Sequence, residues 1–196
     1  MVPIRLLGPR LAVREYHHTP AEVDALHALF GDPEVTRHLP FGPCDRETCA
    51  DQLELYLEEA MAEPRSTYRL AMVRRADAED PADAVPVGQA ALTLGTDGSA
   101  DLGYVLGSRV RGLGYAGEAA GLLCGLAFGA LGLHRLAASV DADNTASARV
   151  LTRLGFRAEG RVRQDGPAGG ARRDAYRYGL LAADWPGLPP DLPPAR

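Results

Sequence analysis

Residues 109–117 read RVRGLGYAG, a stretch that combines three glycines with two arginines, Arg109 and Arg111. It lies between residues 100–106, which alternate as a strand does, and residues 115–131, a run of small and apolar residues that predicts a helix. The N-terminus of a helix attracts anions through its free backbone N–H groups and its dipole, and glycine lets a ligand approach the backbone closely. The stretch therefore predicts a site for an anionic ligand. The structural alternative is that Gly112 and Gly114 only allow tight turns and that the two arginines are solvated, with no ligand bound.

The pattern on both sides of this stretch predicts an α+β domain. Thr96-Asp97-Gly98 predicts the turn of an antiparallel hairpin between strands 87–94 and 100–106. The other expected strands are 11–16, 68–74, 135–140, 156–163 and 174–181, and the other expected helices are 20–30, 45–62 and 145–154. This makes about seven strands in a mixed, mostly antiparallel sheet, flanked by about four helices.

The domain is expected to span residues 1–185 as a single unit. The segment 31–44 contains three prolines and is expected to be irregular, as is the Gly/Pro loop 166–170. The tail 186–196 is rich in proline, and we expect it to be poorly ordered.

The charge is unevenly distributed along the chain of 196 residues. The net charge is −5, yet residues 101–180 carry 11 arginines and 7 acidic residues, whereas residues 1–100 carry 9 arginines and 17 acidic residues. The overall charge argues against a nucleic-acid-binding surface, which needs a broad positive field. The basic part of the chain is where an anionic ligand is expected.

The remaining composition excludes several other classes of protein. The three cysteines, Cys44, Cys49 and Cys124, lack zinc spacing, and the five histidines are scattered, so no metal site is expected. The N-terminus has no signal-peptide core, and the longest apolar run, about 119–133, is shorter than a membrane span. We expect a soluble, cytoplasmic protein.

The three glycines Gly112, Gly114 and Gly117 also form the dinucleotide pattern GxGxxG, with Asp141 following the next strand. Three observations weigh against this interpretation. The expected strand ends near Leu106 rather than at the first glycine, and the unit comes late in the chain, after a hairpin. Little sequence then remains for the second half of a dinucleotide fold.

The spacing Arg109-x-x-Gly112-x-Gly114 resembles the pyrophosphate-loop pattern of the GNAT superfamily of N-acetyltransferases, (Gln or Arg)-x-x-Gly-x-(Gly or Ala). Further resemblance, to the RimJ/RimL-type ribosomal-protein N-terminal acetyltransferases, lies in RLAVREY, FGDPEVTRHLP, DLGYVLGSRVRGLGYAGEA, HRLAASVDADNTASARVLTRLGFRAEGRVR and RDAYRYGLLAADW. It extends over nearly the whole chain up to Trp185. The resemblance implies a GNAT fold, acetyl-CoA as co-substrate and no metal.

The resemblance also implies which residues bind the cofactor. The backbone of the strand before the glycine loop would hold the pantetheine arm, the loop would hold the pyrophosphate, and the start of the next helix would contact the arm. The implied residues are Val105, Leu106, Arg109, Arg111, Gly112, Leu113, Gly114, Tyr115, Ala116, Asn144 and Ser147. The structural alternatives are core packing for Val105 and Leu106 and helix capping for Asn144.

Acetyl transfer to an amine needs a base for the amine and a proton for the departing thiolate. Asp101 is the first candidate for the base, because similar sequences carry Glu at this position; a solvated residue after the hairpin turn is the structural alternative. Glu159 and Asp143 are further possibilities, whereas Glu118 is expected to pack against the domain or cap its helix. The thiolate takes its proton from solvent, or Ser147 or a Tyr from another segment assists. The sequence departs from the family pattern at two positions. Leu151 replaces the usual Tyr acid, and Ser139 replaces a Glu base.

We expect an enzyme that transfers the acetyl group directly to a primary amine in a ternary complex. The acceptor is a protein N-terminus or a small amine such as an aminoglycoside or a polyamine, and the protein is a monomer or a homodimer. A non-catalytic acyl-CoA-binding regulatory module is the alternative, favoured by Leu151 and Ser139.

A further hypothesis is that acidic residues steer a cationic acceptor toward the site. These residues are Asp77, Glu79, Asp80 and Asp83.

Overall fold

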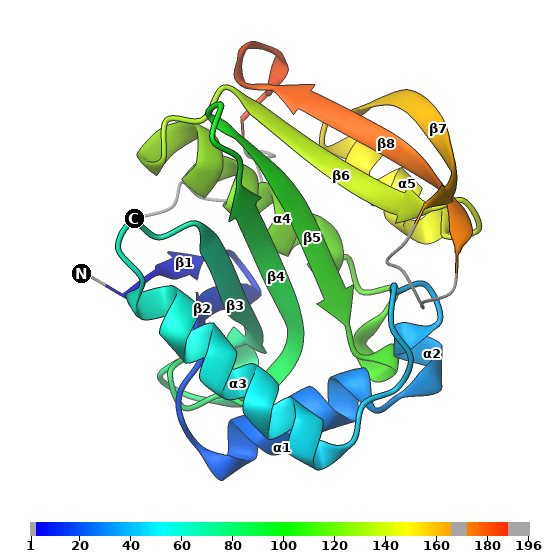
Figure 1. Cartoon of the computed structure of the whole chain (residues 1–196). Coiled ribbons are helices and arrows are strands. Elements are labelled where there is room, and N and C mark those ends of the chain that lie inside the picture. The colour runs from blue at the N-terminus through cyan, green and yellow to red at the C-terminus, as the bar shows by residue number, and fades with distance from the viewer. Residues whose placement is uncertain (1–2, 166–171, 188–196) are drawn as a thin grey trace.

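The computed structural model describes residues 3–165 and 172–187. Eight strands form one sheet in the order β1-β2-β3-β4-β5-β6-β8-β7 (Figure 1). Neighbouring strands are antiparallel except for β5 and β6, which are parallel. The strands are β1 (Arg5–Leu7), β2 (Leu11–Glu15), β3 (Thr67–Arg74), β4 (Pro86–Leu94), β5 (Ser99–Leu106), β6 (Arg135–Asp141), β7 (Arg157–Asp165) and β8 (Arg173–Leu181). The expected α+β class and mostly antiparallel sheet are confirmed.

Helices cover both faces of this sheet. In Figure 1, α1 and α3 lie in front of the sheet, and α4 and α5 lie behind it. The helices are α1 (Pro20–Phe30), α2 (Pro33–Thr36), α3 (Arg46–Met61), α4 (Tyr115–Gly125) and α5 (Thr145–Arg153). In the described residues, no helix has the length and apolar character needed to cross a bilayer.

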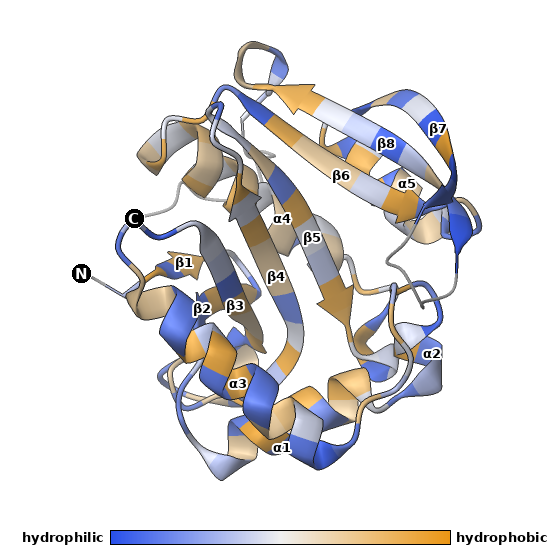
Figure 2. Cartoon of the chain, in the orientation of Figure 1, coloured by the Kyte–Doolittle hydropathy of each residue, from blue (hydrophilic) through white to orange (hydrophobic). Residues whose placement is uncertain are grey.

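Two apolar clusters account for this layering. The larger one joins α4 to the sheet and includes Ala100 and Leu102 of β5. The smaller one lies beneath α1 and α3, and Val105 packs against it from the opposite face of β5. The alternation along β5 thus divides its side chains between the two layers. In α3, apolar and hydrophilic residues alternate along the ribbon (Figure 2), and Cys49, Leu53 and Tyr56 form its buried side. The strand β7, at the edge of the sheet, is largely hydrophilic (Figure 2).

The sequence prediction missed two short elements. β1 has only three residues, and it pairs with β2 from Arg5 opposite Arg14 to Leu7 opposite Ala12. α2 lies inside segment 31–44, which was expected to be irregular. Asp32 caps α2 by accepting a hydrogen bond from the Glu34 N–H at 2.8 Å, and Pro33 occupies the first turn, so a local signal for this helix was present.

Two other expectations concern residues outside the description. The loop 166–170 lies outside the described residues, and so does most of the tail, from residue 188 to residue 196. The extent of the domain, residues 1–185, stays a prediction.

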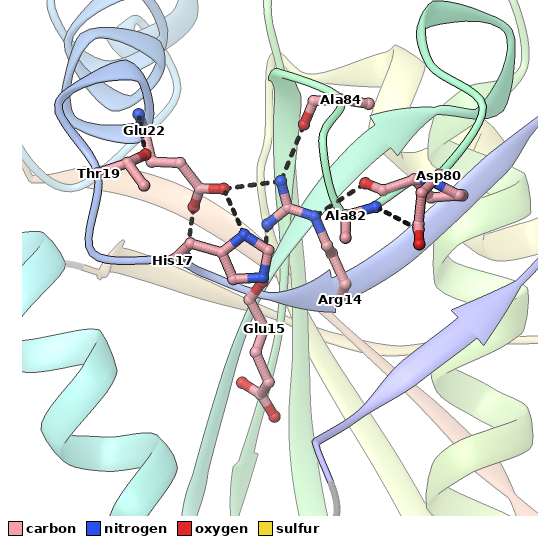
Figure 3. Close-up of polar contacts among 9 residues, drawn as sticks. Arg14, Glu15, His17, Thr19, Glu22, Asp80, Ala82 and Ala84 are labelled. Atoms are coloured by element: carbon pink, nitrogen blue, oxygen red, sulfur yellow. Dashed lines mark hydrogen bonds and ion pairs between the residues drawn. The ribbon is translucent and has the colours of Figure 1, made fainter.

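A buried ion pair fixes α1 and the loop after β3 against β2 (Figure 3). Arg14 and Glu22 approach to 2.7 Å, and each side chain is only 5% exposed. Arg14 also donates to the carbonyl oxygens of Pro81 at 3.1 Å and Ala84 at 2.8 Å, and Glu22 accepts from the His17 N–H at 2.8 Å. One guanidinium therefore joins a strand, a helix and a loop.

Replacing Arg14 by methionine is expected to lower the free energy of unfolding by about 3–5 kcal/mol, because Glu22 would remain buried without its counter-charge. Urea unfolding followed by circular dichroism measures this loss. The matched control is Arg5→Met, since Arg5 pairs with Asp80 at 2.9 Å in an exposed position. That control should change stability by less than about 1 kcal/mol. Equal losses in both variants would contradict the assigned role of Arg14.

Candidate active site

The sheet splits between its two parallel strands. β5 pairs with β6 only at Ser99, Ala100 and Asp101, and the two strands then diverge, as Figure 1 shows. On its other side, β5 stays paired with β4 as far as Leu106, opposite Gly88. Between residues 102 and 106, the backbone edge that β5 turns toward β6 therefore has no partner strand. Such an edge can form main-chain hydrogen bonds with an extended ligand.

The predicted glycine loop follows directly from this open edge. Gly112 and Gly114 have φ angles of +77° and +81°, in the left-handed region that favours glycine. Gly114 is the N-cap of α4 and offers no side-chain cap, so N–H groups of the first turn remain available. A Cβ built at Gly112 would meet no atom within 4 Å, so there is open space above the backbone. These features fit an anionic group such as a phosphate.

The two arginines of the loop lie differently. Arg109 is exposed to solvent. Arg111 is also exposed, and its Nη2 donates to the carbonyl oxygen of Glu34 in α2 at 3.1 Å. Arg111 therefore joins the loop to α2, and its predicted role in phosphate binding is untested.

A sequence profile of the acetyltransferase (GNAT) domain family matches residues 10–157. The chain belongs to the GNAT acetyltransferase family. Two relatives from bacilli are similar over most of their length. The uncharacterized N-acetyltransferase p20 of Bacillus licheniformis is 28% identical over 168 residues, which are 85% of this chain and 90% of p20. The uncharacterized N-acetyltransferase YoaA of Bacillus subtilis (strain 168) is 30% identical over 191 residues, 92% of this chain and 98% of YoaA.

A solved structure confirms the GNAT fold. Mycobacterium smegmatis RimJ, determined in complex with CoA-disulfide, superposes with a TM-score of 0.76 at 24% identity, covering 95% of this chain and 90% of RimJ. The expected GNAT fold is therefore confirmed. GNAT enzymes use acetyl-CoA as co-substrate.

The dinucleotide interpretation of the glycines does not agree with this fold. A dinucleotide site of that type needs a parallel sheet, whereas β5 and β6 are the one parallel pair among the strands that the structure describes. The Asp141 side chain is 7% exposed and interacts with protein groups. It lies 3.3 Å from Arg173 and accepts from the Asp143 N–H at 2.9 Å.

The start of α5 brings together three polar residues of this GNAT domain. Asn144 caps α5, because its amide oxygen accepts from the Ser147 N–H at 3.1 Å. Its contact with a cofactor, through the amide nitrogen, stays a prediction. The Ser147 Oγ lies 2.8 Å from the hydroxyl of Tyr104 in β5, so a hydrogen bond spans the split. Burial raises the pKa of Tyr104 to about 12.

The carboxylates considered from the sequence fall into different settings. Asp101 is exposed on the last paired residue of β5, at the point where the split opens. Asp143 is exposed next to the cap of α5. Glu159 pairs with Arg135, whose Nη1 donates to it at 2.9 Å, and these hydrogen bonds lower the pKa of Glu159. Glu118 is buried in the first turn of α4, where it accepts three hydrogen bonds. Of these carboxylates, Asp101 and Asp143 are therefore the two that are exposed and form no ion pair within residues 3–165 and 172–187, and Asp101 lies where the split opens.

The two positions that depart from the family pattern also differ from each other. Leu151 is fully buried in the core. Its side chain is a hydrocarbon, so it cannot supply a proton. Ser139 is exposed, and its Oγ donates to Asp165 of β7 at 3.2 Å. Arg177 donates to the same carboxylate oxygen at 3.1 Å. The tertiary structure thus brings a carboxylate beside Ser139 that sequence reasoning did not identify, because Asp165 lies 26 residues away in the chain.

The region of α2 bridges the two sides of the split. On the β5 side, Ser108 Oγ donates to Asp32 at 2.8 Å, and this bond is the main cause of the lowered pKa of Asp32. On the β6 and β8 side, Arg173 donates to the carbonyl oxygen of Arg37 at 2.7 Å, and His38 Nδ1 lies 3.4 Å from Asp141. The segment 32–38 therefore lies across the ends of the diverging strands.

The acidic residues proposed to steer an acceptor are partly neutralised by neighbours. Asp77 pairs with Arg74 at 2.8 Å and Asp80 pairs with Arg5 at 2.9 Å. These ion pairs reduce the negative field of the loop, which weakens the steering hypothesis.

Proposed function

We propose that this GNAT domain transfers the acetyl group of acetyl-CoA directly to a primary amine in a ternary complex. The observation that carries the proposal is the open edge of β5, which leads from Asp101 straight into the glycine loop at the head of α4. An extended arm bound along this edge would place its thioester near the apex of the split and its pyrophosphate at the helix N-terminus. Val105 and Leu106 would act through their backbone groups.

In this reaction the amine nitrogen attacks the thioester carbonyl carbon, a C–N bond forms and the C–S bond breaks. One proton must leave the amine and one must reach the thiolate sulfur. An alkyl amine has a pKa of about 10, so it is mostly protonated at neutral pH and needs a base. Asp101 is the proposed base, acting directly or through a water molecule. Asp165 is the competing candidate for the base, because it accepts a hydrogen bond from Ser139, the residue that replaces the Glu base of the family pattern.

Ser147 is the proposed proton donor to the thiolate. A serine hydroxyl is a weak acid, so Ser147 would give its proton to the thiolate while it takes one from the Tyr104 hydroxyl, which lies 2.8 Å away. The Tyr104 phenolate would then recover a proton from solvent. Burial raises the pKa of Tyr104 to about 12, so its hydroxyl is protonated at neutral pH but is a weaker acid than an ordinary tyrosine. This pair would take the place of the tyrosine that Leu151 replaces.

The acceptor is proposed to be a protein N-terminus, or else a small amine such as an aminoglycoside or a polyamine. The RimJ-like stretches of sequence support the first choice, and the exposed carboxylates Asp101 and Asp143 suit any cationic amine. We expect a monomer or a homodimer.

An acetyl-transfer assay tests the proposal. Free thiol is measured after mixing the protein with acetyl-CoA and one acceptor at a time: peptides with free N-termini, spermidine or kanamycin. The acceptor is then checked by mass spectrometry for one added acetyl group. A peptide with a blocked N-terminus and no lysine is the matched control. The chain contains no lysine, so acetylation of its own side-chain amines cannot release thiol.

The alternative function is a non-catalytic acyl-CoA-binding module, which Leu151 and Ser139 favour. Calorimetry of acetyl-CoA binding on the same protein separates the two. Binding together with acceptor-dependent thiol release supports the enzyme. Binding without thiol release for every acceptor supports the module, and no binding of acetyl-CoA contradicts both.

A further inference from the structure

The glycine loop lies next to a buried negative charge. Glu118 stands in the first turn of α4, with its side chain only 3% exposed, one turn after Gly114. A carboxylate at this place repels any other anion that approaches the helix N-terminus, and burial strengthens the repulsion because water does not screen it. A pyrophosphate site here therefore needs a counter-charge for Glu118.

Arg10, in the turn between β1 and β2, supplies that counter-charge. Its Nε donates to Glu118 Oε2 at 2.8 Å, and the backbone N–H groups of Arg10 and Leu11 both donate to Oε1 at 2.8 Å. The carboxylate is thus bound by three donors from one turn. Arg10 and Glu118 are 108 residues apart in the chain, so local sequence patterns do not reveal this contact.

The same guanidinium also lies against the glycine loop. Arg10 Nη1 donates to the carbonyl oxygen of Leu113 at 2.7 Å, and its Cζ lies 5.2 Å from the centre of the Tyr115 ring. Nη2 lies 3.2 Å from the position that a Cβ on Gly114 would occupy. Gly114 therefore avoids both backbone strain and a close contact with Arg10.

The side chain of Arg10 is oriented but not enclosed. It remains 52% exposed, and Nη2 forms no hydrogen bond within the described part of the chain. Nε and Nη1 are both engaged, so the guanidinium plane is fixed with one donor group still available beside the loop. A guanidinium held in this way is suited to donate a charge-assisted hydrogen bond to a phosphate oxygen.

We infer that Arg10 is a cofactor-binding residue, which neutralises Glu118 and donates through Nη2 to the pyrophosphate of CoA. The inference rests on the proposed function, since it requires CoA at the glycine loop. It adds to the site a residue from the β1–β2 turn, an element that the loop pattern does not include.

The test is calorimetric titration of CoA into the wild-type protein, Arg10→Gln and the double variant Arg10→Gln/Glu118→Gln. Arg10→Gln should weaken CoA binding by about 10-fold to 100-fold, the effect of one hydrogen bond between charged groups. The double variant should remain at least about 10-fold weaker than wild type, because the phosphate donor is still missing although the repelling carboxylate is gone. Arg5→Gln is the matched control, since Arg5 is a nearby exposed arginine paired with Asp80, and it should bind CoA as the wild type does.

Each outcome has a separate meaning. If the wild type binds no CoA, the proposed function fails. If the wild type binds CoA and Arg10→Gln binds it equally well, the inference alone is wrong. If the double variant recovers wild-type affinity, Arg10 acts only as the counter-charge of Glu118, which overturns the direct contact. Circular dichroism and thermal melting identify a variant that does not fold; in that case Arg10→Lys, which keeps the charge but loses the fixed fork of donors, should still bind CoA more weakly than wild type.

Discussion

Gly112→Asp is expected to abolish the binding of acetyl-CoA. The φ angle of Gly112 is +77°, so any other residue is strained there, at a cost of about 1–2 kcal/mol. A Cβ at this position meets no atom within 4 Å, so the variant should fold. The new side chain would instead fill the open space above the loop, and its carboxylate would repel the pyrophosphate at the N-terminus of α4. Calorimetry should detect no binding at concentrations that saturate the wild type.

Gly132→Asp is the matched control for this variant. Gly132 also has a positive φ, +62°, and a Cβ there also meets nothing within 4 Å, but it lies in the turn before β6 rather than in the loop. The control carries the same backbone strain and the same added charge. It should bind acetyl-CoA normally. Wild-type affinity in Gly112→Asp would refute the location of the cofactor site.

Asp101→Asn is expected to slow acetyl transfer by about 100-fold or more at neutral pH while acetyl-CoA binding is retained. The amide cannot accept the proton of the attacking amine, so only the small deprotonated fraction of the acceptor would react. The defect should therefore shrink as the pH rises toward the pKa of the amine, because the acceptor then loses its proton without help. Rates measured from pH 6 to pH 10 with one acceptor would show this convergence.

Two other variants complete the test of Asp101. Asp97→Asn changes an exposed carboxylate in the β4–β5 turn that accepts hydrogen bonds from Ser99, and it should leave the rate unchanged. Asp165→Asn changes the carboxylate beside Ser139 and should have a smaller effect than Asp101→Asn. A large, pH-dependent loss in Asp165→Asn with a normal rate in Asp101→Asn would transfer the role of base to Asp165.

Much of the fold could be predicted from local patterns. Alternation along residues 100–106 identified β5, and the Thr19, Asp45 and Asn144 caps mark where α1, α3 and α5 begin. These signals act between residues that are close in the chain. β1 was not predicted, because a strand of three residues is too short to show a pattern of alternation. Its pairing with β2 is what makes it a strand. α2 was missed although Asp32 and Pro33 marked its start, since the prolines around it indicated an irregular segment.

The candidate site also combines features that the local sequence predicts with contacts that only the fold creates. The sequence by itself determined the glycine loop and the capped turn of Asn144 and Ser147, because glycine conformation and helix capping are local properties of the backbone. Only the tertiary structure decided that β5 parts from β6 after Asp101, that Tyr104 meets Ser147, and that Arg10 reaches Glu118. These contacts join residues that are 36 or more positions apart, and they form because packing two layers of helices on one sheet brings distant segments together. The free energy of that packing depends on the whole core, so no short stretch of sequence encodes it.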